Sequence, residues 1–165
     1  MKLSDLCSYY KEKRDVSTLD RNHYVSTENM LPNKSGVYGG VSLPSTTQTS
    51  AFQKGDVLVS NIRPYFKKIW LATFDGGCSN DVLVFRVKKG VPASFLYYVL
   101  ANDSFFDYAT ATSKGTKMPR GDKSAIMDYD VPDLPYDVQV KIATILSSLD
   151  KKIALNEEIN HNLSA

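Results

Sequence analysis

The sequence predicts an α+β fold, with a curved, mainly antiparallel β-sheet and packed helices over residues 1–135 and one long helix over residues 136–165. Two observations support this prediction. Short runs of β-branched and aromatic residues, separated by Gly, Pro and Asn, fill the first part of the chain. From Tyr136 onward Gly and Pro disappear, and apolar side chains recur at alternating spacings of four and three residues. A chain of 165 residues can bury one core and carry one appended helix.

The first part of the chain contains four strand signals and one helix signal. The segments with strand composition are residues 24–26, 57–60, 69–72 and 81–87. Pro92 suits the first turn of a helix, and the apolar residues after it recur on one helix face. Those residues are Phe95, Leu96, Val99 and Leu100. We expect this helix to pack on the sheet.

Three irregular segments connect these elements. Residues 32–50 combine Pro, Gly and a Ser/Thr/Gln run without periodicity, which predicts a long surface loop. Residues 111–123 contain two glycines and four cations, which predicts a second loop. Residues 128–135 should be extended because their two prolines disfavour helical backbone in the residues before them.

The predicted C-terminal helix carries a heptad seam of apolar and amide side chains. The seam consists of Ile142, Leu146, Leu149, Ile153, Asn156, Asn160 and Leu163. We expect it to pair with a second helix, the two asparagines fixing the register at some cost in stability. The alternative is that residues 142–149 pack on the chain's own domain. Asp137 suits the first turn, and no Gly or Pro ends the helix before Ala165, so we expect a truncated helix.

Basic charge is concentrated in one region of the chain. The net charge is only +2, but residues 54–123 hold eleven Lys and Arg against six Asp. Residues 136–165 hold three basic and four acidic groups. A regional excess of this kind favours a surface that faces a polyanion and is the opposite of the acidic surface of a DNA mimic.

Residues 60–70 interleave cationic and aromatic side chains directly after a predicted strand. Cations neutralise phosphates and Arg also pairs with guanine, whereas Asn and aromatic side chains contact base edges or stack on bases. We therefore predict five DNA contacts here: Asn61, Arg63, Tyr65, Lys67 and Lys68. A hairpin with aromatic residues inward and cations outward would show the same alternation, although Pro64 interrupts a regular strand.

Residues 113–123 place cations and hydroxyls in a glycine-containing loop, the combination that phosphate contacts require. The predicted contacts are Lys114, Thr116, Lys117, Arg120 and Lys123. The segment is not a phosphate-binding P-loop, because Asp122 rather than Lys follows its second glycine. A solvated charged loop without a ligand is the alternative interpretation.

Signals for catalysis and for metal binding are missing from the sequence. No Gly-rich turn opens a cofactor-binding unit, the carboxylates are scattered, and His23 has no evident nucleophile nearby. Cys7 and Cys78 have no metal-ligand spacing, so we expect two reduced structural thiols. No apolar run approaches the roughly 20 residues of a membrane span, and the N-terminus lacks a signal peptide. We expect a cytoplasmic, non-catalytic chain without membrane contact.

Several motifs along the chain resemble the specificity subunit of type I restriction-modification systems. They are residues 2–7 (KLSDLC), 24–30 (YVSTENM), 52–64 (FQKGDVLVSNIRP), 78–81 (CSND) and 115–120 (GTKMPR). The most diagnostic match is residues 131–135 (VPDLP), which lead into a helix with Gln139 and the heptad seam. The similarity covers one target-recognition domain, residues 1–135, and the spacer helix after it, residues 136–165.

This resemblance implies a function and partners. Such subunits hold two recognition domains apart on two antiparallel helices, and methyltransferase subunits dock on these helices. The resemblance adds Ser79 and Asn80 to the expected DNA contacts and Gln139 to the expected helix interface. It implies that the partners are double-stranded DNA, methyltransferase subunits and, indirectly, the restriction subunit.

The resemblance also implies where the cofactors bind. This chain should hold none, because S-adenosylmethionine, ATP and Mg²⁺ belong to the partner subunits. With only one domain, the chain is either a natural half that pairs with a second copy or an excised fragment. Two other functions stay open: a fragment of a DNA methyltransferase or nuclease, and a protein-interaction module that regulates restriction.

Overall fold

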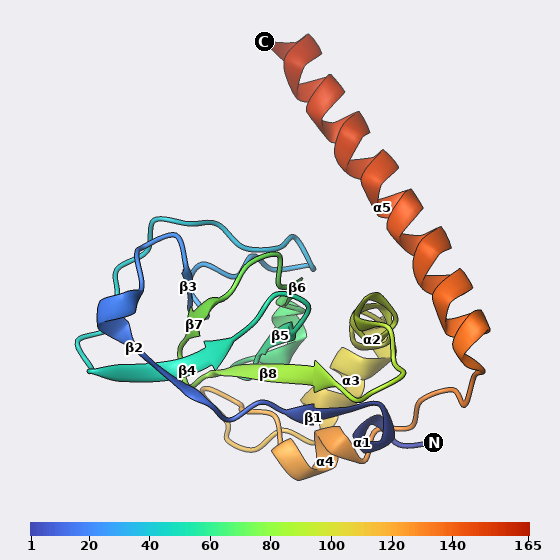
Figure 1. Cartoon of the computed structure of the whole chain (residues 1–165), viewed down its shortest axis with the longest axis horizontal. Coiled ribbons are helices and arrows are strands. Elements are labelled where there is room, and N and C mark those ends of the chain that lie inside the picture. The colour runs from blue at the N-terminus through green and yellow to red at the C-terminus, as the bar shows by residue number, and fades with distance from the viewer.

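The structure is a computed structural model that describes residues 1–165. It contains two four-stranded sheets, a group of short helices and a long C-terminal helix, α5 (Tyr136–Ser164). Figure 1 shows the sheets and short helices gathered in one body, from which α5 projects. The predicted α+β class with a long terminal helix is confirmed, but the predicted single sheet is two sheets.

The first sheet has the order β1 (Cys7–Tyr9), β8 (Val82–Val87), β5 (Val57–Ser60) and β6 (Ile69–Leu71), with all neighbours antiparallel. Side chains of its central strands alternate between two cores, because successive residues of a strand point to opposite faces. Val57, Val59 and Phe85 face a core of 17 buried residues with the helices. Leu58 and Val84 face a smaller core of eight residues with the second sheet. The first sheet is therefore the middle of three layers.

The second sheet has the order β2 (Lys13–Asp15), β4 (Gln48–Phe52), β7 (Gly76–Cys78) and β3 (Tyr24–Val25). Its strands pair antiparallel except β3 and β7, which are parallel. At Gly76 a Cβ atom would collide with the His23 carbonyl oxygen and the Phe52 ring, and at Gly77 it would lie 2.6 Å from Leu19. Glycine at both positions lets the neighbouring strand β4 and the segment before β3 approach β7 closely.

Helices cover the outer face of the first sheet. They are α1 (Leu3–Leu6), α2 (Ala93–Leu100), α3 (Asp103–Ala111) and α4 (Lys123–Met127), with 3₁₀ turns η1 (Val16–Thr18) and η2 (Pro64–Phe66) in the connections. The Asn102 side chain caps α3 by accepting from the Ser104 N–H, and Asp122 caps α4 by accepting from two backbone N–H groups. These caps fix where α3 and α4 begin, and the Asp122 cap thereby sets the end of the loop between the two helices.

The structure confirms most of the elements predicted for the first part of the chain and corrects several boundaries. The four predicted strands are β3, β5, β6 and β8, and the helix predicted after Pro92 is α2. The predicted loop over residues 32–50 is too long, because residues 48–50 form the start of β4. Ala111 and Lys123 belong to helices, so the second loop covers residues 112–122.

Both cysteines and the C-terminal helix agree with the expectations. Cys7 and Cys78 are free and buried, and burial raises the pKa of each thiol to about 12. The helix α5 starts at Tyr136, with Pro135 at the N-cap and Asp137 in the first turn. None of the helices combines the length and apolar composition that a membrane crossing requires.

Candidate nucleic-acid interface

Three segments that are distant in sequence meet beyond the end of β5. The Arg63 N–H donates to the Pro119 carbonyl (2.8 Å), and the Gly121 N–H donates to the Asn61 carbonyl (3.1 Å). The Asn61 N–H donates to the Asp81 carbonyl (2.7 Å). The two predicted DNA-binding loops and the residues after β7 therefore form one continuous surface.

The first part of this surface is the turn η2. Pro64 is buried at its first position, and the flanking residues Arg63 and Lys67 adopt left-handed backbone with φ of 50° and 53°. Tyr65 and Phe66 at the tip are 47% and 40% exposed, with ring centroids 4.9 Å apart. The predicted alternative, a hairpin with aromatic residues inward, is wrong for these two rings.

The second part is a tight loop over residues 114–120. Lys114 and Arg120 exchange both backbone hydrogen bonds, at 2.8 and 2.9 Å, so the loop closes like a small hairpin. Gly115 supplies the positive φ of 95° that the turn requires. Thr116 and Lys117 lie exposed at the tip, where they are available to a ligand.

Two cations of this loop form ion pairs within the chain, and one does not. Lys114 pairs with Asp122 (2.5 Å), and Arg120 pairs with Asp81 (3.2 Å). The hydrogen bond from Lys114 holds the pKa of Asp122 below its usual value, assisted by the backbone N–H groups that it caps. Lys117 pairs with no carboxylate, so it offers an uncompensated positive charge for a phosphate.

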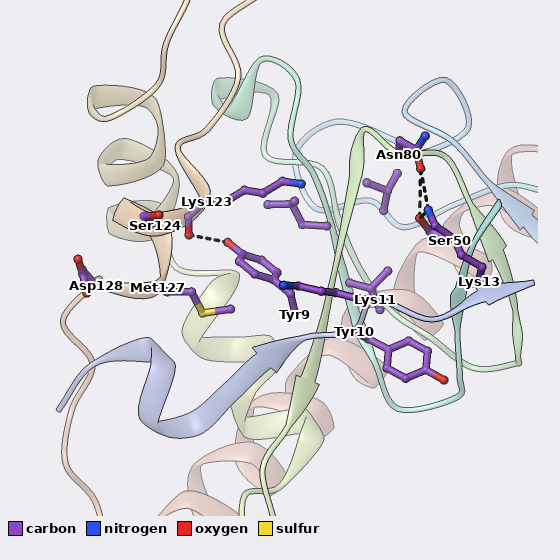
Figure 2. A pocket seen from close by; sticks show the side chains of 13 residues that line it. Tyr9, Tyr10, Lys11, Lys13, Ser50, Asn80, Lys123, Ser124, Met127 and Asp128 are labelled. Carbon is purple, nitrogen blue, oxygen red and sulfur yellow. Dashed lines mark hydrogen bonds between the residues drawn. The ribbon is translucent and has the colours of Figure 1, made fainter.

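A groove adjoins this surface on the side of β1 and α4. Its volume is about 890 Å³, and Figure 2 shows its lining side chains. Asn80 accepts hydrogen bonds from Lys13 and Ser50 at its mouth, each at 3.3 Å, and the Tyr9 hydroxyl donates to the Lys123 carbonyl (3.0 Å). Ser79 is half-buried, and its N–H donates to a β3 carbonyl.

The groove also contains residues that the sequence analysis did not assign to the interface. Tyr9, Tyr10, Lys11 and Lys13 all line the groove, and Lys13 reaches Ser50 and Asn80, so a second group of cations and aromatic residues belongs to it. The signal was present in the sequence, since residues 9–13 read Tyr-Tyr-Lys-Glu-Lys. It lies before the basic region, at residues 54–123, that directed the prediction.

Three of the predicted DNA-contacting side chains are buried or make contacts within the chain. Asn61 is only 8% exposed, and its Oδ1 atom lies buried without a partner beneath Gly121. Lys67 pairs with Asp103 (3.0 Å). Lys68 donates to the Thr27 carbonyl (2.6 Å), and burial lowers its pKa. The Lys67 and Lys68 side chains thus hold the end of the turn η2 through contacts within the chain, whereas the Asn61 side chain is buried.

Helix α5 uses one end for its own domain and leaves the other exposed. Gln139 is buried and donates to the Leu134 carbonyl (2.8 Å), while Ile142 and Leu146 are half-buried. The alternative that the seam packs on its own domain is therefore correct as far as Leu146. Beyond it, Leu149 and Ile153 are 51% and 54% exposed.

The exposed part of α5 is broader than the predicted seam. The remaining seam positions are also exposed, namely Asn156, Asn160 and Leu163. Apolar side chains outside the seam are exposed as well, at Ile145, Leu155 and Ile159. This surface is unusual for a helix that meets only water, because such helices rarely expose so many large apolar residues.

No constellation for metal chemistry accompanies the interface. No group of three or more His, Cys, Asp or Glu side chains is placed to hold a metal ion. His23 pairs with Asp20 (2.7 Å) and packs edge-on against Phe74, which is a structural role. The features that remain define a class of protein, an α+β domain with a cationic loop face and an amphipathic helix available to another polypeptide.

The chain belongs to the family of the type I restriction modification DNA specificity domain, whose model matches residues 1–165. A curated relative is the type I restriction enzyme EcoDI specificity subunit of Escherichia coli, 29% identical over 104 residues. That match covers 63% of this chain and 23% of the relative.

Solved structures show the same fold. The HsdS subunit from Thermoanaerobacter tengcongensis matches with a TM-score of 0.74 at 21% identity over 96% of this chain and 43% of that one. The S subunit from M. genitalium matches with a TM-score of 0.65 at 17% identity over 93% and 39% of the two chains. The chain thus spans less than half the length of these proteins.

Proposed function

We propose that this chain recognises DNA sequence as half of the specificity subunit of a type I restriction-modification enzyme. The observation that carries the proposal is the convergence of η2, residues 79–81 and the 114–120 loop on one surface. Together with family membership, this convergence supports a DNA-recognition surface on which separate elements contact phosphates and bases. The chain itself supplies no catalytic group.

The 114–120 loop would contact the DNA backbone. Lys117 is unpaired and exposed. The Lys114 and Arg120 side chains are 80% and 54% exposed, so they can exchange their partly exposed carboxylate partners for phosphates at small cost, because ion pairs near the surface contribute little. Thr116 and the backbone N–H groups of the tip add neutral donors. Phosphate contacts position the domain on the duplex but do not read its sequence.

Helix α5 would join the domain to the methyltransferase subunits, and through them to the restriction subunit. Its exposed apolar surface from Leu149 to Leu163 supports this assignment, since the domain buries only the first turns. A second copy of the chain, or a second recognition half, would supply the other reader of a split target. S-adenosylmethionine, ATP and Mg²⁺ would bind the partner subunits.

Salt-dependent binding tests the DNA contacts. The full chain, with its methyltransferase subunits, is titrated with a short labelled duplex of mixed sequence at several salt concentrations. Each lost phosphate contact flattens the slope of log K against log salt by about 0.9. The double variant Lys117→Ala and Arg120→Ala should therefore flatten it by up to about 1.8.

A matched control is Lys89→Ala. Lys89 is exposed and follows the far end of β8, whereas the loops of the interface lie at the opposite end of the sheet. Its removal should leave the slope unchanged. If the double variant and the control give the same slope as the unaltered chain, the assignment of the 114–120 loop to DNA fails.

A further inference from the structure

All non-glycine residues with positive φ lie around one turn of this protein. They are Asn33 (55°), Lys34 (61°), Arg63 (50°) and Lys67 (53°). Such backbone is disfavoured for residues with a Cβ atom and persists only where surrounding contacts over-determine it. It clusters at functional sites in proteins, so its concentration around η2 marks this turn for a role beyond connecting two strands.

Backbone hydrogen bonds from two other segments hold the turn. The Asn33 N–H donates to the Phe66 carbonyl (2.9 Å) and the Lys34 N–H to the Lys67 carbonyl (2.8 Å). On the other side, the Arg63 N–H donates to Pro119 (2.8 Å). The turn is thus fixed between the 32–37 segment and the 114–120 loop.

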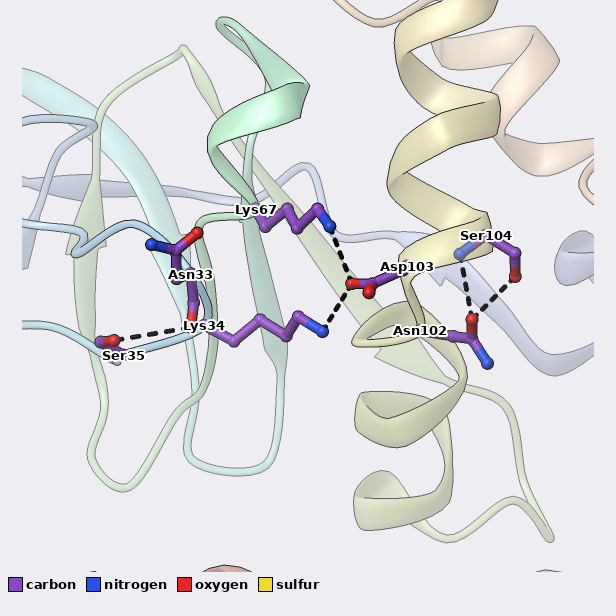
Figure 3. A network of polar contacts seen from close by, with 7 residues as sticks. All are labelled: Asn33, Lys34, Ser35, Lys67, Asn102, Asp103 and Ser104. Atoms are coloured by element: carbon purple, nitrogen blue, oxygen red, sulfur yellow. Dashed lines mark hydrogen bonds and ion pairs between the residues drawn. The ribbon is translucent and has the colours of Figure 1, made fainter. Parts of the chain in front are cut away.

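A carboxylate at the start of α3 completes this support. The Asp103 carboxylate forms ion pairs with Lys34 (2.7 Å) and Lys67 (3.0 Å), and both ammonium groups contact the same oxygen, Oδ1, as Figure 3 shows. These lysines hold the pKa of Asp103 below its usual value. Asp103 orders both lysine side chains and neutralises one of their two positive charges, so the base of the turn is held in place and keeps one net positive charge.

The fixed turn presents the exposed rings of Tyr65 and Phe66 beside the cationic loop. Exposed aromatic rings on a rigid support are suited to contact bases, since they offer apolar area with little loss of conformational entropy on binding. Among the groups on base edges in the major groove, only the C5-methyl of thymine is apolar. The rings therefore have one complementary group on the DNA.

We propose that Tyr65 and Phe66 are a specificity element that contacts thymine methyl groups in the major groove, and that Asp103 is the residue that positions it. This inference rests on the proposed DNA-recognition function and deepens it. It separates the interface into a phosphate-binding part, the 114–120 loop, and a base-reading part, η2.

Replacing thymine by uracil removes only the methyl group and tests the proposal directly. The chain with its methyltransferase subunits first selects duplexes from a random library, and the selected duplex is then measured with thymine and with uracil. The unaltered chain should bind the uracil duplex about fourfold more weakly for each methyl contacted, from about 0.8 kcal/mol per buried carbon. The variant Tyr65→Ala with Phe66→Ala should bind both duplexes equally weakly.

Controls separate this effect from unfolding. Both rings are exposed, so the double variant should have the melting temperature of the unaltered chain. If it melts at a lower temperature, the single variants Tyr65→Ala and Phe66→Ala are measured in its place. Tyr136→Ala removes a similarly exposed ring at the distant start of α5 and should keep the full thymine preference. Equal binding of thymine and uracil duplexes by the unaltered chain, or a preference that survives in the alanine variants, would overturn the proposal.

Asp103→Asn has a separate signature. It releases Lys34 and Lys67, so the thymine preference should fall while binding of unrelated duplexes becomes more salt-dependent, by about 0.9 in slope for each phosphate gained. An unchanged slope with full thymine preference would remove the positioning role. If no duplex is selected from the library, the proposed DNA-recognition function itself is wrong. If duplexes are selected but show no thymine preference, only the role of the two rings is wrong.

Discussion

Asp56 is a buried charged residue at the junction of the two sheets. Its carboxylate is 3% exposed and accepts three hydrogen bonds: from Arg86 Nε (2.8 Å), from Arg86 Nη2 (2.7 Å) and from the Gln53 N–H (2.7 Å). Arg86 also lies 3.4 Å above the Tyr10 ring. Through these contacts one carboxylate ties the start of β5 to β8 and to the residues after β1.

Asp56→Ala should destabilise the fold strongly. Breaking a buried pair by removing one partner costs about 3–5 kcal/mol. The Arg86 side chain remains 29% exposed, so water can partly solvate the arginine that has lost its partner. We therefore expect the free energy of unfolding to fall by about 2–4 kcal/mol. For a chain of this size, this loss lowers the melting temperature by about 10 °C.

Thermal unfolding followed by circular dichroism measures this change, with urea unfolding as a second measure of stability. Asp75→Ala is the matched control, because Asp75 also accepts a backbone N–H, from Lys54 at 2.7 Å, but is exposed. It should cost about 1 kcal/mol or less. A melting temperature of Asp56→Ala equal to that of the control would refute the role assigned to the buried pair.

Three further predictions concern thiols, acid and assembly. Cys7 and Cys78, whose pKa values are about 12, should resist alkylation at pH 8, where about one thiol in ten thousand is ionised; rapid labelling of the native chain would contradict their burial. Ion pairs lower the pKa of Asp103, Asp122 and Asp130, so their stabilisation is complete above pH 4 and is lost as pH falls further. Urea midpoints should show this decline, reduced in Asp130→Asn. The double variant Leu149→Lys, Ile153→Lys should abolish co-purification of the methyltransferase subunits without lowering the melting temperature. The control Lys151→Ala should change neither. Co-purification that persists in the double variant would exclude this helix surface as the binding site of the methyltransferase subunits.

The sequence predicted those elements whose signal is local. The β5 and β8 strands begin with the apolar runs 57–59 and 82–85, which are buried on both faces, and α5 shows its helical spacing throughout. By contrast, β2 is the polar segment Lys-Arg-Asp and β7 begins with two glycines. These strands exist because neighbours pair with them, so their own residues carry little strand signal.

The candidate site was predictable as separate clusters but not as an arrangement. The sequence drew attention to Arg63 and Arg120, but the backbone pairing of Ile62 with Arg120 that brings their loops together is visible only in the structure. The role of Lys34 depends on Asp103, 69 residues later. Asn61 and Gln139 are polar residues that the fold buries, which local composition does not reveal because burial is decided by long-range packing.

DNA methylation in a living host tests the proposed function most directly. A host carrying the cognate methyltransferase subunit is sequenced with methylation-sensitive detection, with and without the gene for this chain. Sequence recognition by this chain predicts a methylated motif that appears only when the gene is present, and that changes or disappears in the Tyr65→Ala, Phe66→Ala double variant. An identical set of methylated motifs with and without the gene would contradict the proposal that this chain selects the target.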